Sequence, residues 1–195
     1  MTIQSARISG GNGERAENDY YATNPKAVEM LLKIHPLNIK TMLEPCVGEG
    51  HIADAIKNIY KDSISVDGID IVDRGYPNTI VADFLTYKTD KKYDAIITNP
   101  PYSLATDFIE KGMSLLNESG NMAMFLKLHF LESSKRQKLF KKFPPKYIYV
   151  FRNRMSTWRY GKPKDDNGKN WVTTICHAWF IWEKGSNSEP IIRWI

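Results

Sequence analysis

Hydrophobic and polar positions alternate along the chain in blocks that predict strands and helices in turn. Apolar runs of strand length occupy residues 41–45, 65–72, 79–84, 93–100, 121–128, 147–151 and 172–182. Apolar residues three and four positions apart, the spacing typical of a helix, occur over 25–35, 51–60, 103–116 and 131–143. Pro25 suits a first helical position, and Thr23 or Asn24 can cap that helix.

This order of elements predicts the fold class. Strands that alternate with helices indicate a parallel sheet with helices on both faces, and a binding crevice at the carboxyl ends of the strands. The last two runs, 147–151 and 172–182, have no helical segment between them and predict an antiparallel pair at the edge of the sheet. We therefore expect an α/β protein with a mostly parallel seven-stranded sheet and an antiparallel edge strand.

Length and composition favour one domain. A chain of 195 residues with 42% hydrophobic residues can bury its own core. Residues 1–18 are glycine-containing and aperiodic and predict a flexible arm, so a single domain is expected over 19–195. No apolar run reaches the roughly 18 residues of a membrane span, and no signal-peptide stretch is visible, so we expect a cytoplasmic protein without a membrane partner. The spacing of cysteines and histidines predicts reduced thiols and no metal site.

The positive charge is concentrated in one part of the chain. Residues 135–170 hold twelve Lys or Arg and two Asp or Glu, a charge of +10, which leaves −5 for the rest of a chain whose net charge is +5. Basic side chains interleaved with aromatic ones can hold phosphates by charge and bases by stacking. Nucleic acid is therefore the expected partner; a solvated helix face with a polar loop is the alternative. The candidate contacts in the loop over about 152–171 are Arg152, Arg154, Trp158, Arg159, Tyr160, Lys162 and Lys164.

A glycine-rich turn separates the first predicted strand of the sheet from its helix. Gly48, Gly50 and Ala53 match a GxGxxA pattern in the strand-to-helix context that makes the pattern informative. Asp70 ends the next strand about twenty residues later, where a carboxylate can accept from both hydroxyls of a ribose. These features suit a dinucleotide or S-adenosylmethionine. Glu44 favours the second, because its charge would repel a pyrophosphate but attract an ammonium and a sulfonium.

The fourth predicted strand runs directly into Asn99, Pro100, Pro101 and Tyr102. The two prolines restrict the backbone and lack N–H groups. The Asn99 side-chain oxygen and the Pro100 carbonyl can accept both hydrogens of one planar amino group, which favours a tetrahedral nitrogen with its lone pair directed at an electrophile. Tyr102 can stack on the target ring and hold it outside a helix. The alternative is a rigid turn with Tyr102 packed inside.

The segments YYATNP, EPCVGEG, DGIDI, ADF and NPPY, in this order, resemble the class I S-adenosylmethionine-dependent amino-methyltransferases. More narrowly they resemble small N6-adenine DNA methyltransferases. The resemblance implies a Rossmann-like methyltransferase fold and S-adenosylmethionine as the cofactor. It implies these cofactor contacts: Tyr21 and Thr23 near the methionine part, Glu44, Gly48 and Gly50 around the methionine and ribose, Asp70 on the ribose hydroxyls with Ile71 beside it, Asp83 on the adenine amino group, Phe84 against that ring, and Asn99 at the transferred group.

The same resemblance narrows the substrate. The NPPY chemistry of this family serves adenine N6, cytosine N4 and the glutamine side-chain amide. Cytosine enzymes more often carry serine where this chain has Asn99, which favours adenine. We therefore expect a site-specific DNA-methyltransferase that flips an adenine out of DNA. The alternatives are the same reaction on RNA, a catalytically inactive nucleic-acid-binding module with this fold, and a nicotinamide oxidoreductase, which would leave the NPPY motif unused.

Overall fold

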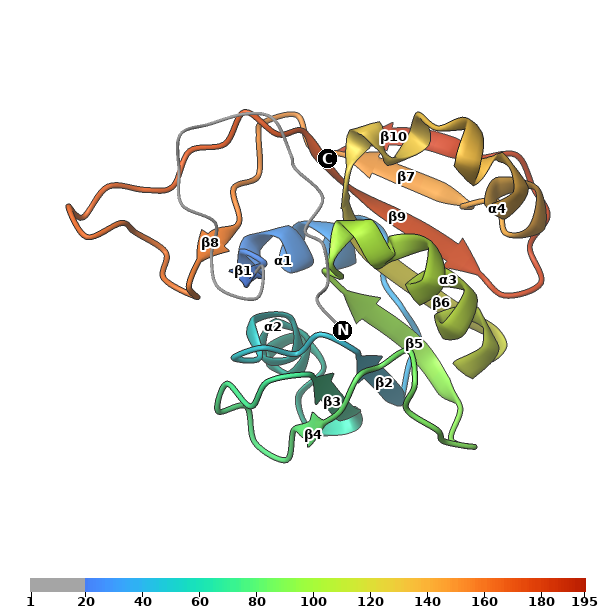
Figure 1. Ribbon diagram of the computed structural model, residues 1–195, viewed down its shortest axis with the longest axis horizontal. Helices are drawn as coiled ribbons and strands as arrows, with labels where there is room; N and C mark the ends of the chain where they lie inside the picture. The colour runs from blue at the N-terminus through green and yellow to red at the C-terminus, as the bar shows by residue number, and fades with distance from the viewer. Residues whose placement is uncertain (1–19) are drawn as a thin grey trace, which may run out of the picture.

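The computed structural model describes residues 20–195 (Figure 1), so the arm predicted over 1–18 lies outside the described residues. Eight strands form one sheet in the order β10-β7-β9-β6-β5-β2-β3-β4, and β1 and β8 form a second, two-stranded sheet. The strands are β1 Tyr21–Ala22, β2 Thr41–Glu44, β3 Ser65–Asp70, β4 Ile80–Val81, β5 Tyr93–Thr98, β6 Leu116–Lys127, β7 Tyr147–Val150, β8 Trp158–Arg159, β9 His177–Glu183 and β10 Ile191–Trp194. The α-helices are α1 Pro25–Ile34, α2 His51–Tyr60, α3 Ala105–Leu115 and α4 Gln137–Lys142.

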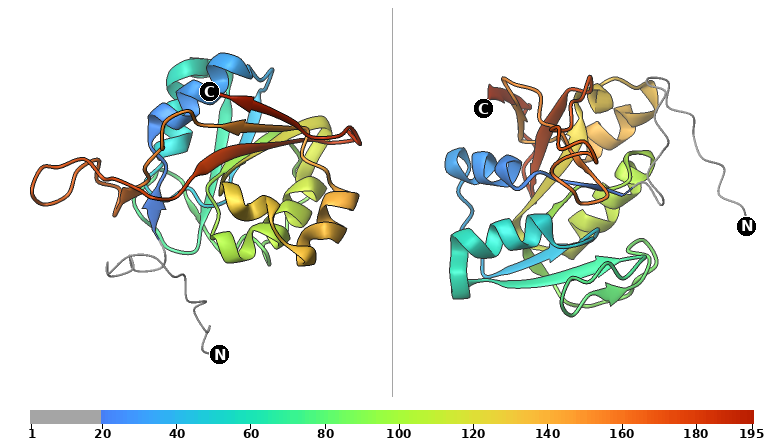
Figure 2. Two further views of the ribbon diagram at one scale, coloured as in Figure 1. Left: turned by 90° about the horizontal axis from the view of Figure 1, so that it is seen from above. Right: turned by 90° about the vertical axis from the view of Figure 1, so that its left-hand side faces the viewer.

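Helices cover both faces of the large sheet, as the alternating pattern predicts. Successive side chains of a strand point to opposite faces, and β6 shows the result. Ala123 and Phe125 join the hydrophobic layer under α1 and α2. Met122, Met124 and Leu126 join the layer under α3 and α4. Figure 2 (left) shows the two pairs of helices on opposite sides of the sheet.

The predicted strand count is wrong, whereas the predicted antiparallel pairing of the last two apolar runs is confirmed by β7 and β9. The sheet has eight strands rather than seven, and β9 lies between β6 and β7, antiparallel to both. The physical reason is that six of the seven residues of β9 are buried, so this strand needs cover on both faces and a neighbour on each side. The edge is formed instead by β10, which pairs with β7 in parallel and which the apolar pattern alone did not predict.

Helix α1 begins as predicted and is anchored to the centre of the sheet. Asn24 is its N-cap, with the side-chain Oδ1 accepting from Lys26 N at 3.0 Å, and Pro25 occupies the first turn. The indole Nε1 of Trp179 in β9 donates to the Ala27 carbonyl at 2.9 Å, and both residues are fully buried. This bond joins the first helix to a strand near the other end of the chain.

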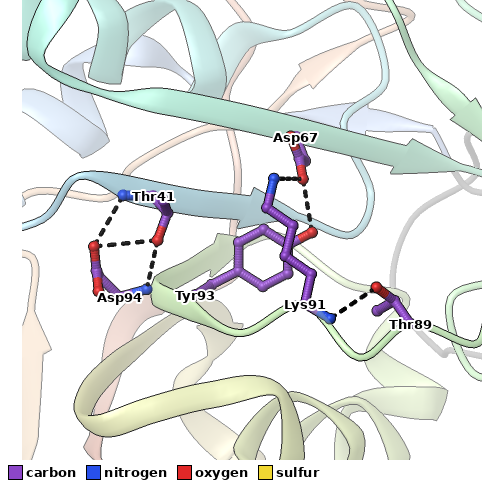
Figure 3. Close-up of polar contacts among 6 residues, drawn as sticks. All are labelled: Thr41, Asp67, Thr89, Lys91, Tyr93 and Asp94. Carbon is purple, nitrogen blue, oxygen red and sulfur yellow. Dashed lines mark hydrogen bonds and ion pairs between the residues drawn. The ribbon is translucent and has the colours of Figure 1, made fainter.

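Polar side chains hold the amino ends of the central strands in register, at the sheet edge opposite the carboxyl ends (Figure 3). Asp94 Oδ2 accepts from Thr41 N at 3.0 Å and from Thr41 Oγ1 at 3.1 Å, which ties β5 to β2. Hydrogen bonds to its carboxylate lower the pKa of Asp94, and the bond from the Lys40 amide has the largest effect. Tyr93 and Lys91 both donate to Asp67 Oδ2, at 2.7 and 2.6 Å, which ties β5 to β3.

Two smaller expectations concern the cysteines and the membrane. Cys46 and Cys176 are both free thiols. Within residues 20–195, every helix is too short or too polar to cross a bilayer.

The Trp179 bond generates a stability prediction. Trp179→Phe removes a buried donor and leaves a small void, so we expect the free energy of unfolding to fall by about 1–3 kcal/mol. Trp194→Phe is the matched control, since Trp194 is 62% exposed, and its effect should stay within about 0.5 kcal/mol. Denaturant unfolding of both variants measures this; equal effects would contradict the role given to the indole bond.

Candidate functional site

The carboxyl ends of β2 and β5 lie side by side at a point where the strand order changes direction. The chain runs from β2 outward to β3 and β4, then returns to β5 on the other side of β2. Ligands of open α/β sheets bind in the crevice at such a switch point. The glycine turn follows β2 and the Asn99–Tyr102 segment follows β5, so the fold brings the two motifs to one crevice.

The glycines of the turn are required by the backbone and by two tyrosines. Gly48 and Gly50 have φ of 55° and 90°, in the left-handed region that side chains disfavour. A Cβ on Gly48 would lie 2.6 Å from a ring carbon of Tyr20, and one on Gly50 would lie 2.2 Å from the ring of Tyr76. The GxGxxA pattern predicts glycines that let a ligand approach the backbone closely. In the structure, the rings of Tyr20 and Tyr76 occupy the space into which a Cβ on Gly48 or Gly50 would point.

Tyr20 closes over the turn through further contacts. Its hydroxyl accepts from the Glu49 amide at 3.2 Å, and the Arg74 guanidinium lies 4.2 Å from the centre of its ring. Burial raises the pKa of Tyr20 to about 12. Tyr20, Arg74 and Tyr76 were not predicted as site residues, because no local pattern shows which side chains cover a turn.

Asp70 lies where a ribose would be expected. Its Oδ2 accepts from Gly48 N at 2.9 Å and its Oδ1 from Val72 N at 3.1 Å. Each carboxylate oxygen keeps further acceptor capacity, and the side chain of Ile71 beside it is 62% exposed. A carboxylate for two hydroxyls next to an exposed apolar side chain fits the adenosine part of S-adenosylmethionine, and these two residues would hold it.

Glu44 is buried rather than open to the crevice. It is 2% exposed, and its Oε2 accepts from Ala53 N at 2.9 Å in the first turn of α2. Burial raises the pKa of this carboxyl well above its usual range. The structure thus gives Glu44 a helix-capping contact. Thr23 is equally buried, and its Oγ1 has no hydrogen-bond partner among the described residues.

The two residues expected to contact the adenine of the cofactor follow β4. Asp83 is exposed, and its Oδ1 accepts from Leu85 N at 2.9 Å. Phe84 is 2% exposed and packs on Phe108 of α3, with ring centres 4.9 Å apart. Phe84 therefore belongs to the hydrophobic layer under α3, and Asp83 stands at the surface of the turn.

Asn99 is held in one orientation by the first strand. Its Nδ2 donates to the Tyr21 carbonyl at 3.0 Å. The amide oxygen therefore lies at the other end of the group, as an acceptor that this bond does not use. Pro100 is buried and Pro101 half-buried, and neither has an amide hydrogen to compete for an acceptor. Tyr102 is half-buried, and burial raises its pKa.

The predicted recognition loop is joined to this site. In the β1–β8 sheet Tyr21 pairs with Arg159 and Ala22 with Trp158. The ring of Trp158, one of the candidate nucleic-acid contacts, packs edge-on against His51 at the start of α2, with ring centres 5.4 Å apart.

The loop also approaches the glycine turn. A Cβ on Gly161 would meet the Glu49 carboxylate, so the loop backbone lies against the side chain of the residue between Gly48 and Gly50.

The charge-rich stretch divides into two surfaces. Arg152, Lys162 and Lys164 are exposed in the loop, and Tyr160 is 47% exposed. Arg154 is also exposed and donates to the Thr174 carbonyl at 2.8 Å. Helix α4, which carries further lysines, lies on the opposite side of the molecule from β8 (Figure 1). The +10 segment is thus not one continuous patch.

No family model matches the chain. Over 102 residues it is 36% identical to "Type II methyltransferase M.CvrRI" of Paramecium bursaria Chlorella virus XZ-6E, a match that covers 46% of this chain and 26% of that protein. The chain thus spans about a quarter of the length of the curated relative that it matches.

Solved structures show the same fold. The type I restriction-modification system methyltransferase subunit from Streptococcus thermophilus superposes with a TM-score of 0.64 at 14% identity, over 92% of this chain and 48% of that one. An S-adenosylmethionine-dependent O-methyltransferase from Thermotoga maritima superposes with a TM-score of 0.57 at 16% identity, over 87% and 69% of the two chains. The fold is the Rossmann-like methyltransferase fold. The chain resembles class I S-adenosylmethionine-dependent methyltransferases, and this resemblance implies S-adenosylmethionine as the cofactor.

The tyrosine cover on the glycine turn can be tested with two alanine variants. Gly50→Ala and Gly75→Ala both place a side chain at positive φ, at 90° and 91°, which costs about 1–2 kcal/mol. Only Gly50→Ala also drives a Cβ into a buried ring, because a Cβ on Gly75 meets nothing within 4 Å. We expect Gly50→Ala to lower the free energy of unfolding by about 1–3 kcal/mol more than Gly75→Ala does. Equal losses in denaturant unfolding would show that Tyr76 does not constrain the turn.

Proposed function

We propose that this protein transfers a methyl group from S-adenosylmethionine to the exocyclic N6 amino group of adenine in DNA, after the base has been flipped out of the duplex. The proposal combines the fold, the glycine turn with Asp70, the NPPY segment and the basic loop. The matched proteins support it, because one is named a type II methyltransferase and another a restriction-modification methyltransferase subunit.

The observation that carries the proposal is the hydrogen bond from Asn99 Nδ2 to the Tyr21 carbonyl, at 3.0 Å. With its NH₂ end held in this way, Asn99 offers an oxygen acceptor next to Pro100, whose carbonyl is a second acceptor. Two acceptors that take both hydrogens of an amino group draw it away from the plane of the ring and free its lone pair for attack. A side chain that presented its NH₂ end would repel the same amino group.

The bound cofactor would supply a methyl group on a sulfonium sulfur, which is the electrophile. The residues that would hold its adenosine part are Asp70 and Ile71, at the end of β3. The N6 nitrogen gains the methyl group and then loses a proton to water, so the chain needs no strong general base. Tyr102 provides the aromatic surface on which the flipped base would stack.

The loop over 152–171 is the surface we propose for DNA. Its exposed basic side chains can bind the phosphates that flank a flipped nucleotide, and Tyr160 is exposed for contact with neighbouring bases. Unpairing and unstacking one base costs a few kcal/mol, which phosphate contacts of this kind can offset. Since Trp158 packs on His51, we assign it to positioning the loop rather than to occupying the space that a flipped base leaves in the duplex.

Substitution of Asn99 tests the catalytic assignment. Asn99→Ala removes one of the two acceptors, so we expect methyl transfer to slow by about 100-fold or more. The control is Asn187→Ala. Asn187 is exposed and follows β9, at the end of the sheet opposite the candidate site, so this variant should keep the wild-type rate. Incorporation of tritiated methyl groups into genomic DNA that lacks adenine methylation is the measurement, followed by modification-sensitive sequencing to map the methylated base.

Parallel reactions on transcript RNA show whether DNA or RNA is the preferred substrate. Faster incorporation into RNA than into DNA would replace the proposed substrate with RNA. Tight nucleic-acid binding with no incorporation into either would favour a catalytically inactive binding module. A full rate in Asn99→Ala would show that Asn99 does not orient the amino group.

The division of the basic stretch generates a prediction about salt. Lys164→Gln in the loop should weaken DNA binding and reduce the slope of log affinity against log salt by about 1. Lys141→Gln is the matched control, because Lys141 is exposed on α4, on the side away from β8. Its slope should equal that of the wild type in fluorescence anisotropy titrations. The opposite pattern would place the DNA on the α4 side.

A further inference from the structure

A buried lysine lies directly beside the proposed target-base site. Lys127 is the last residue of β6 and is 7% exposed, in a strand whose preceding residues Met122–Leu126 are fully buried apolar side chains. Because β6 runs parallel to β5, Lys127 lies at the same end of the sheet as the NPPY segment, where the strands have their carboxyl ends. Lys127 thus places a charged side chain at the end of an apolar strand, next to the target-base site, and the proposed chemistry has not used it.

The aromatic partner of Lys127 is Tyr102. The Lys127 Nζ lies over the Tyr102 ring, 4.8 Å from its centre. A cation over the face of a ring is attracted by the negative charge of that face, most strongly where water is excluded. With the ammonium on one face, a stacked base would have to lie against the opposite face of Tyr102, whose side chain is half-buried.

His177 also lies close to this pair. It is paired with Lys127 across β6 and β9, and its ring centre lies 6.2 Å from that of Tyr102. Its Nδ1 is 2.9 Å from the Met155 carbonyl, so Nδ1 carries the hydrogen and Nε2 the lone pair. Burial lowers the pKa of His177 to about 4. The imidazole is therefore neutral near pH 7 and does not repel the ammonium.

We propose that Lys127 is a positioning residue for the target base: its ammonium holds the Tyr102 ring from one face so that the opposite face stacks on the flipped adenine. This inference rests on the proposed function. It predicts a selective effect, in which Lys127 governs the rate of transfer from the bound complex rather than the affinity for DNA, since a buried ammonium does not reach the phosphates.

A double-mutant cycle tests whether Lys127 acts through Tyr102. Lys127→Met keeps the length of the side chain and removes the charge, whereas Lys127→Arg keeps the charge. Single-turnover methyl transfer is measured on duplex DNA that carries the site mapped by sequencing. We expect Lys127→Met to slow transfer about tenfold and Lys127→Arg to remain within about threefold of the wild type. In a Tyr102→Leu background, Lys127→Met should cause no further slowing.

The matching affinity measurements separate positioning from binding. Cofactor affinity by calorimetry and DNA affinity by anisotropy should equal the wild-type values in Lys127→Met. A tenfold loss that persists in the Tyr102→Leu background would overturn the proposal, as would a loss of DNA affinity that accounts for the slower rate.

A spectroscopic measurement keeps the proposal testable if Lys127→Met does not fold. The ε-methylene protons of Lys127 should show an upfield ring-current shift in NMR spectra of the wild type, and this shift should vanish in Tyr102→Leu. Its absence in the wild type would refute the contact. If the wild type transfers no methyl group to any nucleic acid while the shift is present, the proposed function fails on its own and the contact stands.

Discussion

Two hydrophobic layers share the same strands, and this constraint sets the position of the site residues at the ends of those strands. Along β6 the side chains alternate between the layer under α1 and α2 and the layer under α3 and α4. A shift of one residue in register would turn each buried side chain to the wrong face. The strand ends cannot move without exposing buried side chains, so core packing places Glu44, Asn99 and Lys127 together at the carboxyl ends of the parallel strands.

Polar groups are buried at this edge to an unusual degree. Glu44, Lys127 and His177 are each less than a tenth exposed, and Thr98 Oγ1 has no hydrogen-bond partner among the described residues. Buried polar groups oppose folding unless they are fully satisfied, and nothing comparable is found along the apolar middle of β9. Glu44 and His177 each make a hydrogen bond there, and a local concentration of buried polar groups of this kind marks a candidate functional site.

The small β1–β8 sheet is what joins the parts of the site. Its Tyr21 accepts from Asn99 through the carbonyl and pairs with Arg159 of the basic loop, while Trp158 rests on the first residue of α2. Asn99, the start of the glycine-turn helix and the loop are therefore held by one pair of two-residue strands. A movement of the loop would therefore be transmitted to Asn99 through Tyr21.

The sequence by itself determined the α/β class, the capped start of α1, and the switch point that brings the glycine turn and the NPPY segment together. These follow from strand period, helix period and turn chemistry, which are local properties of a few residues. Only the tertiary structure decided that β9 lies inside the sheet, that β10 forms its edge, and that Lys127 lies over Tyr102. The same holds for Glu44, which caps α2, and for the tyrosines that cover Gly48 and Gly50. Which strand pairs with which, and which side chain covers a turn, depends on the burial of surfaces far apart in the chain, and no local pattern carries that information.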